Sequence, residues 1–484
     1  TAGTVFENDQ FLPDHPPLGR LLLGLSHDLT SWSISGSEGT IYNVVAARIG
    51  SCAAFAVTVL LLAEFARRRD GIVSAVLTVL VLVAMPRVIG HSRLAALETM
   101  TSLAWTAAVL HLASHWTGST SPPWKQSLIG GILFGLLLLT KVQGILLPPM
   151  IVFWALLRFR WNAVKPLMIW GLTGACVFFI GWPWLWQDPV GHTLQYLGRT
   201  TDRQTLYCWY LGTRYADKLV PWHYPFVMML ATLPLSAVVG LGARLIRRRF
   251  DAADQFLAIS ILGPLLVFAV PGTPVYDGTR LFLIVTPMIA VLAGRGLHLT
   301  LMWLQSLRLP STGDTSAPRQ SRCMWSLTSC AAVLICVSIF LPSVPSVISP
   351  FAMDDYGPLV GGNRGAQTLG MESGYWADAL NGDFWEQVPE GSLVSVAPVS
   401  HQFQLTAMEA LVPVIQQRKI RLQAFRYDSS QQRGLLLLIH RLADLRPGLQ
   451  STPAGARRVA VVTHGSVILC ELVDTTDATW IETP

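Results

Sequence analysis

The stretch Asp14-His15-Pro16-Pro17-Leu18-Gly19-Arg20 places charged residues and two prolines directly before the first of about ten long apolar segments. Prolines restrict the backbone and would hold Asp14 and His15 in place where an amphipathic segment begins. We predict that this patch contributes polar groups to a site at the membrane surface. The alternative is the proline-bearing first turn of an interfacial helix, and these residues alone favour neither interpretation.

The composition of the chain indicates an integral membrane protein. Of its 484 residues, 51% are hydrophobic and 13% are charged, and the mean hydropathy is +0.45. Its apolar runs reach the roughly 20 residues that cross a bilayer as a helix. The net charge of +6 is spread over short basic clusters between these runs. We therefore interpret the clusters as topology signals and expect no nucleic-acid partner.

The cysteines give no sign of a metal site or of a disulfide framework. Seven are scattered along the chain, and four of them, Cys52, Cys176, Cys330 and Cys336, lie within apolar runs. No CxxC spacing is present, and we find no P-loop and no GxGxxG after a strand. We expect neither a metal nor a nucleotide cofactor.

Hydropathy predicts ten membrane spans. We place them at residues 41–63, 71–87, 95–114, 126–142, 143–159, 166–184, 222–243, 255–272, 281–303 and 323–342. The run from 126 to 159 is too long for one span, because a helix rises about 1.5 Å per residue and the run would be nearly twice as long as a bilayer core. Lys141, Gln143 and Gly144 are therefore predicted to form a turn between two spans.

Basic clusters predict the orientation of these spans. Arg67-Arg68-Arg69 and the clusters within 158–165, 244–249 and 308–322 fall in alternate loops, as the positive-inside rule requires if those loops are cytoplasmic. We expect a multi-pass protein of the inner (plasma) membrane. Its predicted parts are an extracytoplasmic loop with an interfacial helix at 1–40, a transmembrane domain at 41–342 and an extracytoplasmic domain at 343–484.

The last part of the chain has a different pattern from the apolar runs before it. Strand-like segments at 392–396 and 458–462 flank a helical pattern near 402–417. We predict a small α/β domain there. The expected fold class is therefore mainly α, with a polytopic helical membrane part and this small mixed domain.

His91 and Glu98 are candidate functional residues at the start of a span. Ionisable side chains at membrane depth cost roughly 3 kcal/mol on insertion scales, so they require a partner or a role. If a helix begins near Ser92, two turns separate His91 from Glu98 and both can lie on one face. The alternative for Glu98 is a structural salt bridge to Arg93 or Arg87.

Lys141 and Arg280 are the corresponding cations at the ends of other spans. Lys141 either extends to the membrane interface or binds a lipid phosphate through its ammonium group. Arg280 follows Tyr276 and Asp277, and its forked guanidinium suits bidentate phosphate binding. Interfacial anchoring is the alternative for Arg280.

An aromatic loop lies between these two cations in the sequence. It includes Trp222 and His223, after aromatic clusters at 182–186 and 207–210. Aromatic residues at an interface commonly form a belt, but flat rings also pack against sugars and isoprene chains. Both interpretations remain open for Trp222 and His223.

Four features together resemble the GT-C polytopic glycosyltransferases, specifically the protein O-mannosyltransferase and aminoarabinose transferase superfamily. They are the His-Pro-Pro-Leu patch at 15–18, Glu98 at the start of a span, the Leu-Thr-Lys turn that ends at Lys141, and the pattern from Tyr276 to Arg280. The resemblance covers about residues 11–300. It rests on the order of these motifs and on their common side of the membrane.

The resemblance implies a polyprenyl-phosphate sugar donor in the membrane lipid. An inverting transfer would move the sugar to a protein, lipid or glycan acceptor on the outer face. It also implies that Glu98 matches the second acidic position of the family, that His15 lies where relatives carry a basic or polar residue, and that Lys141 and Arg280 match basic positions near the lipid phosphate. The candidate catalytic residues are Glu98 and Asp14. The candidate substrate-binding residues are His15, His91, Lys141, Tyr276, Arg280, Trp222 and His223.

The chain departs from the family at its principal Asp, which relatives carry well before the His-Pro-Pro position. Only 14 residues precede His15 here, so we expect that an upstream span is missing from this sequence. The alternatives are that Glu7, Asp9 or Asp14 replaces that Asp, or that the protein is inactive.

Two other classes of function compete with glycosyl transfer. One is a polytopic lipid or sugar transporter or flippase, and the other is a membrane-anchored scaffold whose tail binds a partner. The sequence shows no internal repeat of the kind found in many secondary transporters. Its polar groups also concentrate at the predicted outer face, which favours the transferase.

Overall fold

A computed structural model of the chain describes residues 15–34, 43–201, 204–306, 334, 336–399, 401–426 and 433–478. Asp14 and most of the expected span at 323–342 lie outside the described residues. The chain forms two compact units. A helical unit draws on 1–204, 233–273 and 279–347, and a sheet unit draws on 205–232, 274–278 and 348–484.

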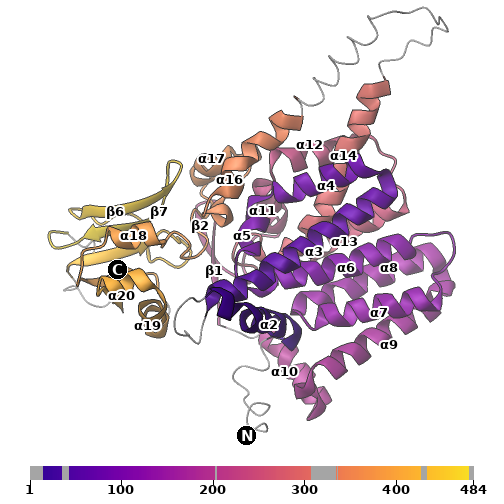
Figure 1. The fold of residues 1–484 in the computed structure, drawn as a ribbon, viewed down its shortest axis with the longest axis horizontal. Coiled ribbons are helices and arrows are strands. Elements are labelled where there is room, and N and C mark those ends of the chain that lie inside the picture. The colour runs from indigo at the N-terminus through magenta and orange to yellow at the C-terminus, as the bar shows by residue number, and fades with distance from the viewer. Residues whose placement is uncertain are drawn as a thin grey trace, which may run out of the picture. The chain divides into compact units, whose positions relative to one another are not determined.

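The helical unit is built from helices separated by short breaks (Figure 1). Its elements are α2 (Pro17–Ile34), α3 (Val44–Asp70), α4 (Ile72–Val83), α5 (Pro86–Ser92), α6 (Leu97–His115), α7 (Trp124–Leu138), η1 (Val142–Leu146), α8 (Leu147–Phe159), η2 (Arg160–Ala163), α9 (Val164–Gly181), η3 (Pro183–Trp186), α10 (Pro189–Thr201), α12 (Leu235–Ile246), α13 (Ala252–Phe268), η4 (Arg280–Val285), α14 (Thr286–Ser306) and η5 (Leu341–Ser343). A further short helix, α16 (Val344–Ile348), ends at the boundary between the units.

The predicted turn at Lys141 is confirmed. The helix α7 ends at Leu138, and the N–H of Thr140 bonds back to Leu137 over 3.0 Å. Lys141 is extended, with φ −165° and ψ 158°, and the short helix η1 begins at Val142. The apolar run at 126–159 is therefore two helical segments rather than one.

Several expected spans are broken in the structure. Proline accounts for two of these breaks, because it lacks the N–H that would continue a helix. The expected span 71–87 bends before Pro86, and the expected span 222–243 is interrupted at Leu233 and Pro234. Within the described residues, three helical stretches are long and apolar enough to cross a bilayer, or five if each bent pair is one span. The multi-pass character is confirmed, with fewer unbroken spans than the ten expected.

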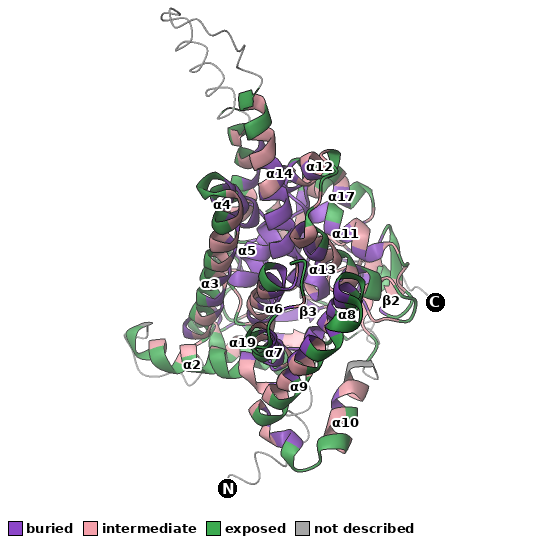
Figure 2. Ribbon diagram, turned by 90° about the vertical axis from the view of Figure 1, so that its right-hand side faces the viewer, coloured by how far each residue is buried: buried purple, intermediate pink, exposed green. Residues whose placement is uncertain are grey.

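The helix α14 forms the interior of the helical unit. The apolar window of the continuous stretch η4–α14 (Arg280–Ser306) is 89% buried inside the protein, whereas the window of α3 is 22% buried. Figure 2 shows α14 largely in the buried colour and outer helices such as α3 and α8 largely in the other colours. Both helices are apolar. The apolar side chains of α3 largely face outward, where lipid would contact them, whereas those of α14 pack against other helices.

Helices α7 and α9 approach closely at glycines. Gly131 and Gly135 are four residues apart in α7, the small-residue spacing that lets two membrane helices come together. A Cβ added at Gly131 would lie 2.6 Å from the carbonyl oxygen of Trp170. One added at Gly135 would lie 2.7 Å from that of Gly174. Larger side chains at these positions would force the two helices apart.

Basic clusters lie together at one end of the helical unit. The buried Asp254, in the first turn of α13, is bound by Arg69 from the end of α3 at 2.8 Å, by Arg295 at 2.5 Å and by Arg244 from the end of α12. Arg158, at the end of α8, donates to the carbonyl oxygen of Gly118 just after α6. The ends of α3, α6, α8 and α12 thus share one end of the bundle.

The sheet unit contains a hairpin and a five-stranded mixed sheet. Its elements are β1 (Tyr207–Tyr210), β2 (Thr213–Ala216), α11 (Tyr224–Thr232), η6 (Ala352–Asp354), η7 (Pro358–Val360), α17 (Gly362–Thr368), α18 (Gly382–Glu386), β3 (Leu393–Ala397), α19 (Gln402–Leu411), α20 (Pro413–Gln417), β4 (Arg421–Ala424), β5 (Leu435–Ile439), η8 (Pro447–Leu449), β6 (Arg457–His464) and β7 (Val467–Asp474). The five strands lie in the order β4-β3-β5-β7-β6.

The sheet has a parallel half and an antiparallel half. Strand β3 pairs in parallel with β4 and β5, with Val394 opposite Leu422 and Leu435, while β7 pairs antiparallel with β5 and β6. Central β5 reads as a continuous apolar run because both of its faces are covered. The predicted strands at 392–396 and 458–462 and the helical pattern near 402–417 are confirmed, as is the mainly helical fold class with a small α/β part.

Candidate active site

Glu98 is the centre of a buried ion cluster in the helical unit. It lies in the first turn of α6, where the positive end of the helix dipole stabilises a carboxylate. Its exposed fraction is only 4%. One oxygen, Oε1, accepts from Nζ of Lys141 at 2.8 Å and from Nε of Arg280 at 2.6 Å. Three candidate residues from distant parts of the sequence therefore meet at one atom.

These contacts differ from the salt bridge that was the structural alternative for Glu98. Arg93 donates instead to the carbonyl oxygen of Val347 at 2.7 Å. The observed partners of Glu98 are Lys141 and Arg280, the two cations predicted for the lipid phosphate. The structure places both cations in direct contact with Glu98, and their roles in catalysis stay predictions.

Two further basic side chains, His91 and Arg87, lie close to this ion cluster. His91 is buried and interacts electrostatically with Glu98, Arg280, Lys141 and Arg87. Arg87, on α5, is itself buried. Among the described residues, the Glu98 carboxylate is thus bound by two permanent cations, with His91 and Arg87 close by. From the sequence, Arg87 is predicted only as a salt-bridge alternative for Glu98, although an arginine inside an apolar run is itself a signal of function.

Glu98 presents a second oxygen to the cluster interior. Its Oε2 atom is buried and, within the described part of the chain, has no hydrogen-bond partner. A buried acceptor without a donor is costly, so a hydrogen-bond donor at this atom would be stabilising.

The segment that carries His15 packs beside this cluster. The N–H of Leu18 donates to the carbonyl oxygen of Leu139 at 3.0 Å. A Cβ added at Gly19 would lie 2.7 Å from Cδ2 of Leu97 and 3.6 Å from the oxygen of Thr140. The start of α2 is therefore in contact with the immediate neighbours of Glu98 and Lys141.

The remaining predicted residues lie outside the helical unit. Tyr276, Trp222 and His223 belong to the sheet unit. There, Nδ1 of His223 is 2.8 Å from the hydroxyl of Tyr210, while the Trp222 side chain is exposed. The structure therefore brings together His91, Glu98, Lys141 and Arg280, with the His15 segment next to them, and assigns the other three to a different unit.

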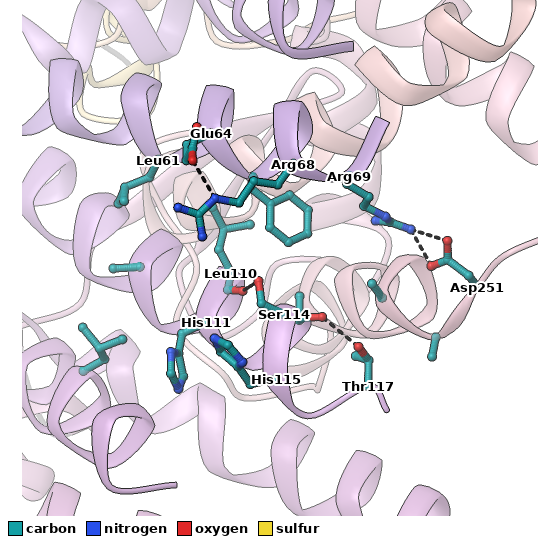
Figure 3. A pocket seen from close by; sticks show the side chains of 16 residues that line it. Leu61, Glu64, Arg68, Arg69, Leu110, His111, Ser114, His115, Thr117 and Asp251 are labelled. Carbon is teal, nitrogen blue, oxygen red and sulfur yellow. Dashed lines mark hydrogen bonds and ion pairs between the residues drawn. The ribbon is translucent and has the colours of Figure 1, made fainter. Parts of the chain in front are cut away.

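A separate cavity of about 790 Å³ lies near the basic end of the helical unit (Figure 3). Leu61, Arg68 and Arg69 of α3 and His111 and His115 of α6 line it. His115 follows Glu98 by 17 positions in one helix, which corresponds to roughly 25 Å at a rise of about 1.5 Å per residue. This cavity is therefore distinct from the Glu98 cluster, and its cations face the opposite end of α6.

Comparison with known proteins gives a family match. Residues 14–186 match the family described as dolichyl-phosphate-mannose-protein mannosyltransferase. None of the curated proteins compared with the chain matches it.

The chain also resembles solved structures at low sequence identity. One is ArnT from Cupriavidus metallidurans in the apo state, with 16% identity and a TM-score of 0.47 over 97% of this chain and 91% of that one. The same protein bound to undecaprenyl phosphate is 16% identical, with a TM-score of 0.47; the match covers 96% of this chain and 88% of that one. The Archaeoglobus fulgidus oligosaccharyltransferase tethered with an acceptor peptide is 12% identical, with a TM-score of 0.43; the match covers 86% of this chain and 53% of that one.

The family match spans the helices that carry Glu98, Lys141 and the start of α2, and it confirms the resemblance predicted from the motifs. Residues 14–186, less than half of the chain, are thus similar to the dolichyl-phosphate-mannose-protein mannosyltransferase family.

Proposed function

We propose that the protein transfers a sugar, with inversion, from a polyprenyl-phosphate donor to an acceptor hydroxyl on the extracytoplasmic face of the membrane. The observation that carries this proposal is the shared binding of Glu98 Oε1 by Lys141 and Arg280 while Oε2 has no partner among the described residues. The cluster thus combines cations for a leaving phosphate with a carboxylate oxygen for an incoming hydroxyl.

The phosphate would bind to the cations of the cluster. When the bond between the anomeric carbon and the phosphate oxygen breaks, the electron pair stays on the phosphate, which gains a negative charge. Lys141, Arg280 and Arg87 stabilise that charge in a site from which water is largely excluded. An ammonium has three N–H donors and a guanidinium has five, so Lys141 and Arg280 can bind Glu98 and a phosphate oxygen at the same time.

The acceptor would bind on the carboxylate side. Its hydroxyl donates to Oε2 of Glu98, attacks the anomeric carbon from the face opposite the phosphate, and loses its proton to the carboxylate. The new glycosidic bond forms as the old bond breaks, so the configuration inverts without a covalent enzyme intermediate. His15 and His91 are proposed to position the donor, since the His15 segment packs beside the cluster and His91 interacts with four charged side chains there.

The proposed orientation is supported by the charges at one end of the helical unit. Arg69, Arg158 and Arg244 mark one end, and Glu98 lies at the other end of α6. Lysine and arginine are enriched on the cytoplasmic side of membrane proteins. Glu98 and the acceptor would therefore be on the extracytoplasmic side.

A double-mutant cycle at Lys141 and Arg280 tests the proposal. Lys141→Gln, Arg280→Gln and the double variant would be purified as full-length protein in proteoliposomes. The assay would measure transfer of labelled sugar from a polyprenyl-phosphate donor to acceptors extracted from cell membranes. Arg158→Gln is the matched control, because it removes a cation at the opposite end of the bundle.

We expect each single variant to lower the transfer rate by about 100-fold, as removal of one charge-stabilising donor commonly does. The double variant should lose less than the product of the single losses, because both cations act on one phosphate. Near-normal transfer in both folded single variants would contradict the proposal. Movement of the donor across the bilayer without any transfer would favour a flippase instead.

A further inference from the structure

The sheet unit contains a polar cavity that the proposed reaction does not use. Its volume is about 300 Å³, at the small end of the range of about 300–1,000 Å³ for small-molecule sites. Three separate parts of the chain line it, near residue 370, between 440 and 452, and at the turn between β6 and β7. The cavity is therefore a product of the tertiary fold rather than of one loop.

Neutral hydrogen-bonding side chains converge on this cavity without partners in the protein. Gln367, Ser373, Gln450, Ser451 and Ser466 line it. Within the described residues, none of these five side chains bonds to another protein group; Gln367, Ser451 and Ser466 are exposed and the other two are partly buried, so all are open to a ligand from solvent. Amides and hydroxyls can both donate and accept. The cavity thus presents a set of unused donors and acceptors that carries no formal charge.

Two apolar side chains complete the lining of the cavity. Leu442 and Ile468 are both partly buried there. No lysine, arginine, aspartate or glutamate of the described chain lines it. A phosphate or carboxylate ligand would find no countercharge, whereas a ligand with hydroxyl groups around an apolar ring face would match both kinds of side chain.

A buried carboxylate fixes one wall of the cavity. Glu471 of β7 is fully buried and accepts from Nε2 of His440 at 3.1 Å, from the hydroxyl of Thr452 at 2.6 Å and from Nε of Arg458 at 2.7 Å. His440 and Thr452 both line the cavity. Because the carboxylate can only accept, Nε2 of His440 is the donor in this contact.

A second carboxylate holds the neighbouring backbone. Glu372 accepts from the N–H groups of Leu442 at 2.5 Å and of Ala443 at 3.1 Å. The chain between His440 and Ala443 is therefore fixed at both the side-chain and backbone levels. Binding groups that are already held in place cost less entropy to order when a ligand arrives.

We propose that this cavity binds one neutral sugar unit, a pyranose whose hydroxyls bind the five uncommitted side chains and whose apolar face packs on Leu442 and Ile468. Two sources could supply such a unit, namely an acceptor glycan or the sugar of the lipid-linked donor. The site lies in the sheet unit and involves no residue of the Glu98 cluster. Its existence therefore does not depend on the proposed reaction.

Ligand-observed saturation-transfer NMR on the full-length protein in detergent tests this site. The probes are methyl α-D-mannopyranoside and methyl β-D-glucopyranoside, with galacturonate as a charged comparison. The first variant, Ser466→Tyr, adds bulk at an exposed turn and fills the cavity. The second, Gln367→Ala with Gln450→Ala, removes two amides and leaves the space open. Gln417→Ala is the matched control, because this exposed glutamine at the end of α20 does not line the cavity.

We expect saturable binding of at least one neutral glycoside and none of galacturonate. Ser466→Tyr should abolish the signal, and the double alanine variant should weaken binding about tenfold, since each lost hydrogen bond contributes a few-fold to affinity. Gln417→Ala and Glu98→Gln should bind as the unchanged protein does. Retained binding in Glu98→Gln would distinguish this site from the proposed active site, whatever the transfer assay shows.

Competition identifies the source of the sugar. Displacement of the glycoside by a polyprenyl-phosphate sugar would assign the site to the donor, and displacement by soluble oligosaccharides alone would assign it to an acceptor glycan. The proposal is overturned if no neutral glycoside binds saturably. It is also overturned if Ser466→Tyr and the double alanine variant, both folded, bind as the unchanged protein does.

Discussion

Arg280 donates from Nε to Oε1 of Glu98 over 2.6 Å, although 182 positions separate the two residues in the chain. Lys141 donates to the same oxygen at 2.8 Å. Charges buried in this way lose their hydration, and the loss is offset only when the partners are close and well oriented. The position of each charge in the cluster therefore depends on the other two, and removal of one should have effects beyond its own contact.

Glu98→Gln should separate phosphate binding from sugar transfer. The substitution keeps the size of the side chain but removes the negative charge, so the cluster becomes more positive. We expect binding of undecaprenyl phosphate to be kept or tightened, while transfer falls by about 100-fold or more, because no carboxylate remains to accept the proton. Lipid binding by native mass spectrometry and transfer in proteoliposomes would measure the two effects.

Glu64→Gln is the control for this experiment. Glu64 forms partly exposed ion pairs with Arg67 and Arg68 at the other end of the helical unit, where such pairs contribute little. It should leave both measurements unchanged. Normal transfer by a folded Glu98→Gln protein would exclude Glu98 as the base.

Gly19→Val should disturb the active site through packing alone. A Cβ at Gly19 would already lie 2.7 Å from Cδ2 of Leu97, the residue next to Glu98. The two further methyl groups of valine should push the start of α2 away from Leu97 and Thr140, since overpacking typically costs about 1–3 kcal/mol. We expect about a tenfold loss of transfer.

Gly24→Val is a matched control on the same helix, because a Cβ there meets no atom within 4 Å. Thermal unfolding of both variants would show whether the protein remains folded. Equal transfer by the two variants would mean that the start of α2 does not position the site.

Gly135→Val should destabilise the helical unit without touching the Glu98 cluster. The added Cβ would lie 2.7 Å from the carbonyl oxygen of Gly174, and a backbone atom cannot move aside as a side chain can. We expect the free energy of unfolding to fall by about 1–3 kcal/mol. Gly171→Val, on α9, is the control, because a Cβ at Gly171 meets nothing within 4 Å. Similar unfolding temperatures for both variants would contradict the close approach of α7 and α9.

Glu471 should make the sheet unit sensitive to acid. Burial by itself raises the pKa of this carboxyl, but hydrogen bonds from His440, Thr452 and Arg458 outweigh burial and lower the pKa from 4.5 to about 2. A carboxyl with a lowered folded pKa stabilises the protein above its unfolded pKa, and this stabilisation is lost as the pH falls. We expect a loss of roughly 3 kcal/mol as the pH falls from about 4.5 to about 2.

Hydrogen exchange of the β5 and β7 amides, corrected for intrinsic rates, would measure this loss in the full-length protein. Glu471→Gln should be less stable at neutral pH and should show a flatter dependence on pH across the same window. If the variant and the unchanged protein lose protection in parallel, another group is responsible for the acid sensitivity.

The sequence determined the class of the protein and the local breaks in its helices. Apolar runs and few charges specify a membrane protein because the bilayer admits little else. The turn at Lys141 and the strands near 392–396 and 458–462 were predictable because each depends on neighbouring residues. Glu98, Lys141 and Arg280 were identifiable as members of a site because isolated charges at membrane depth are costly without a role.

Only the tertiary structure decided which charges meet and which helices are buried. The windows of α3 and η4–α14 have similar hydropathies of 2.0 and 1.7, yet 22% and 89% of them are buried inside the protein. Lipid tails and protein interiors are both apolar, so hydropathy cannot separate a helix that faces lipid from one that faces other helices. The same holds for the charged residues. Arg87 comes to lie near His91, and Lys141 and Arg280 come to share one oxygen of Glu98, only when the helices pack together.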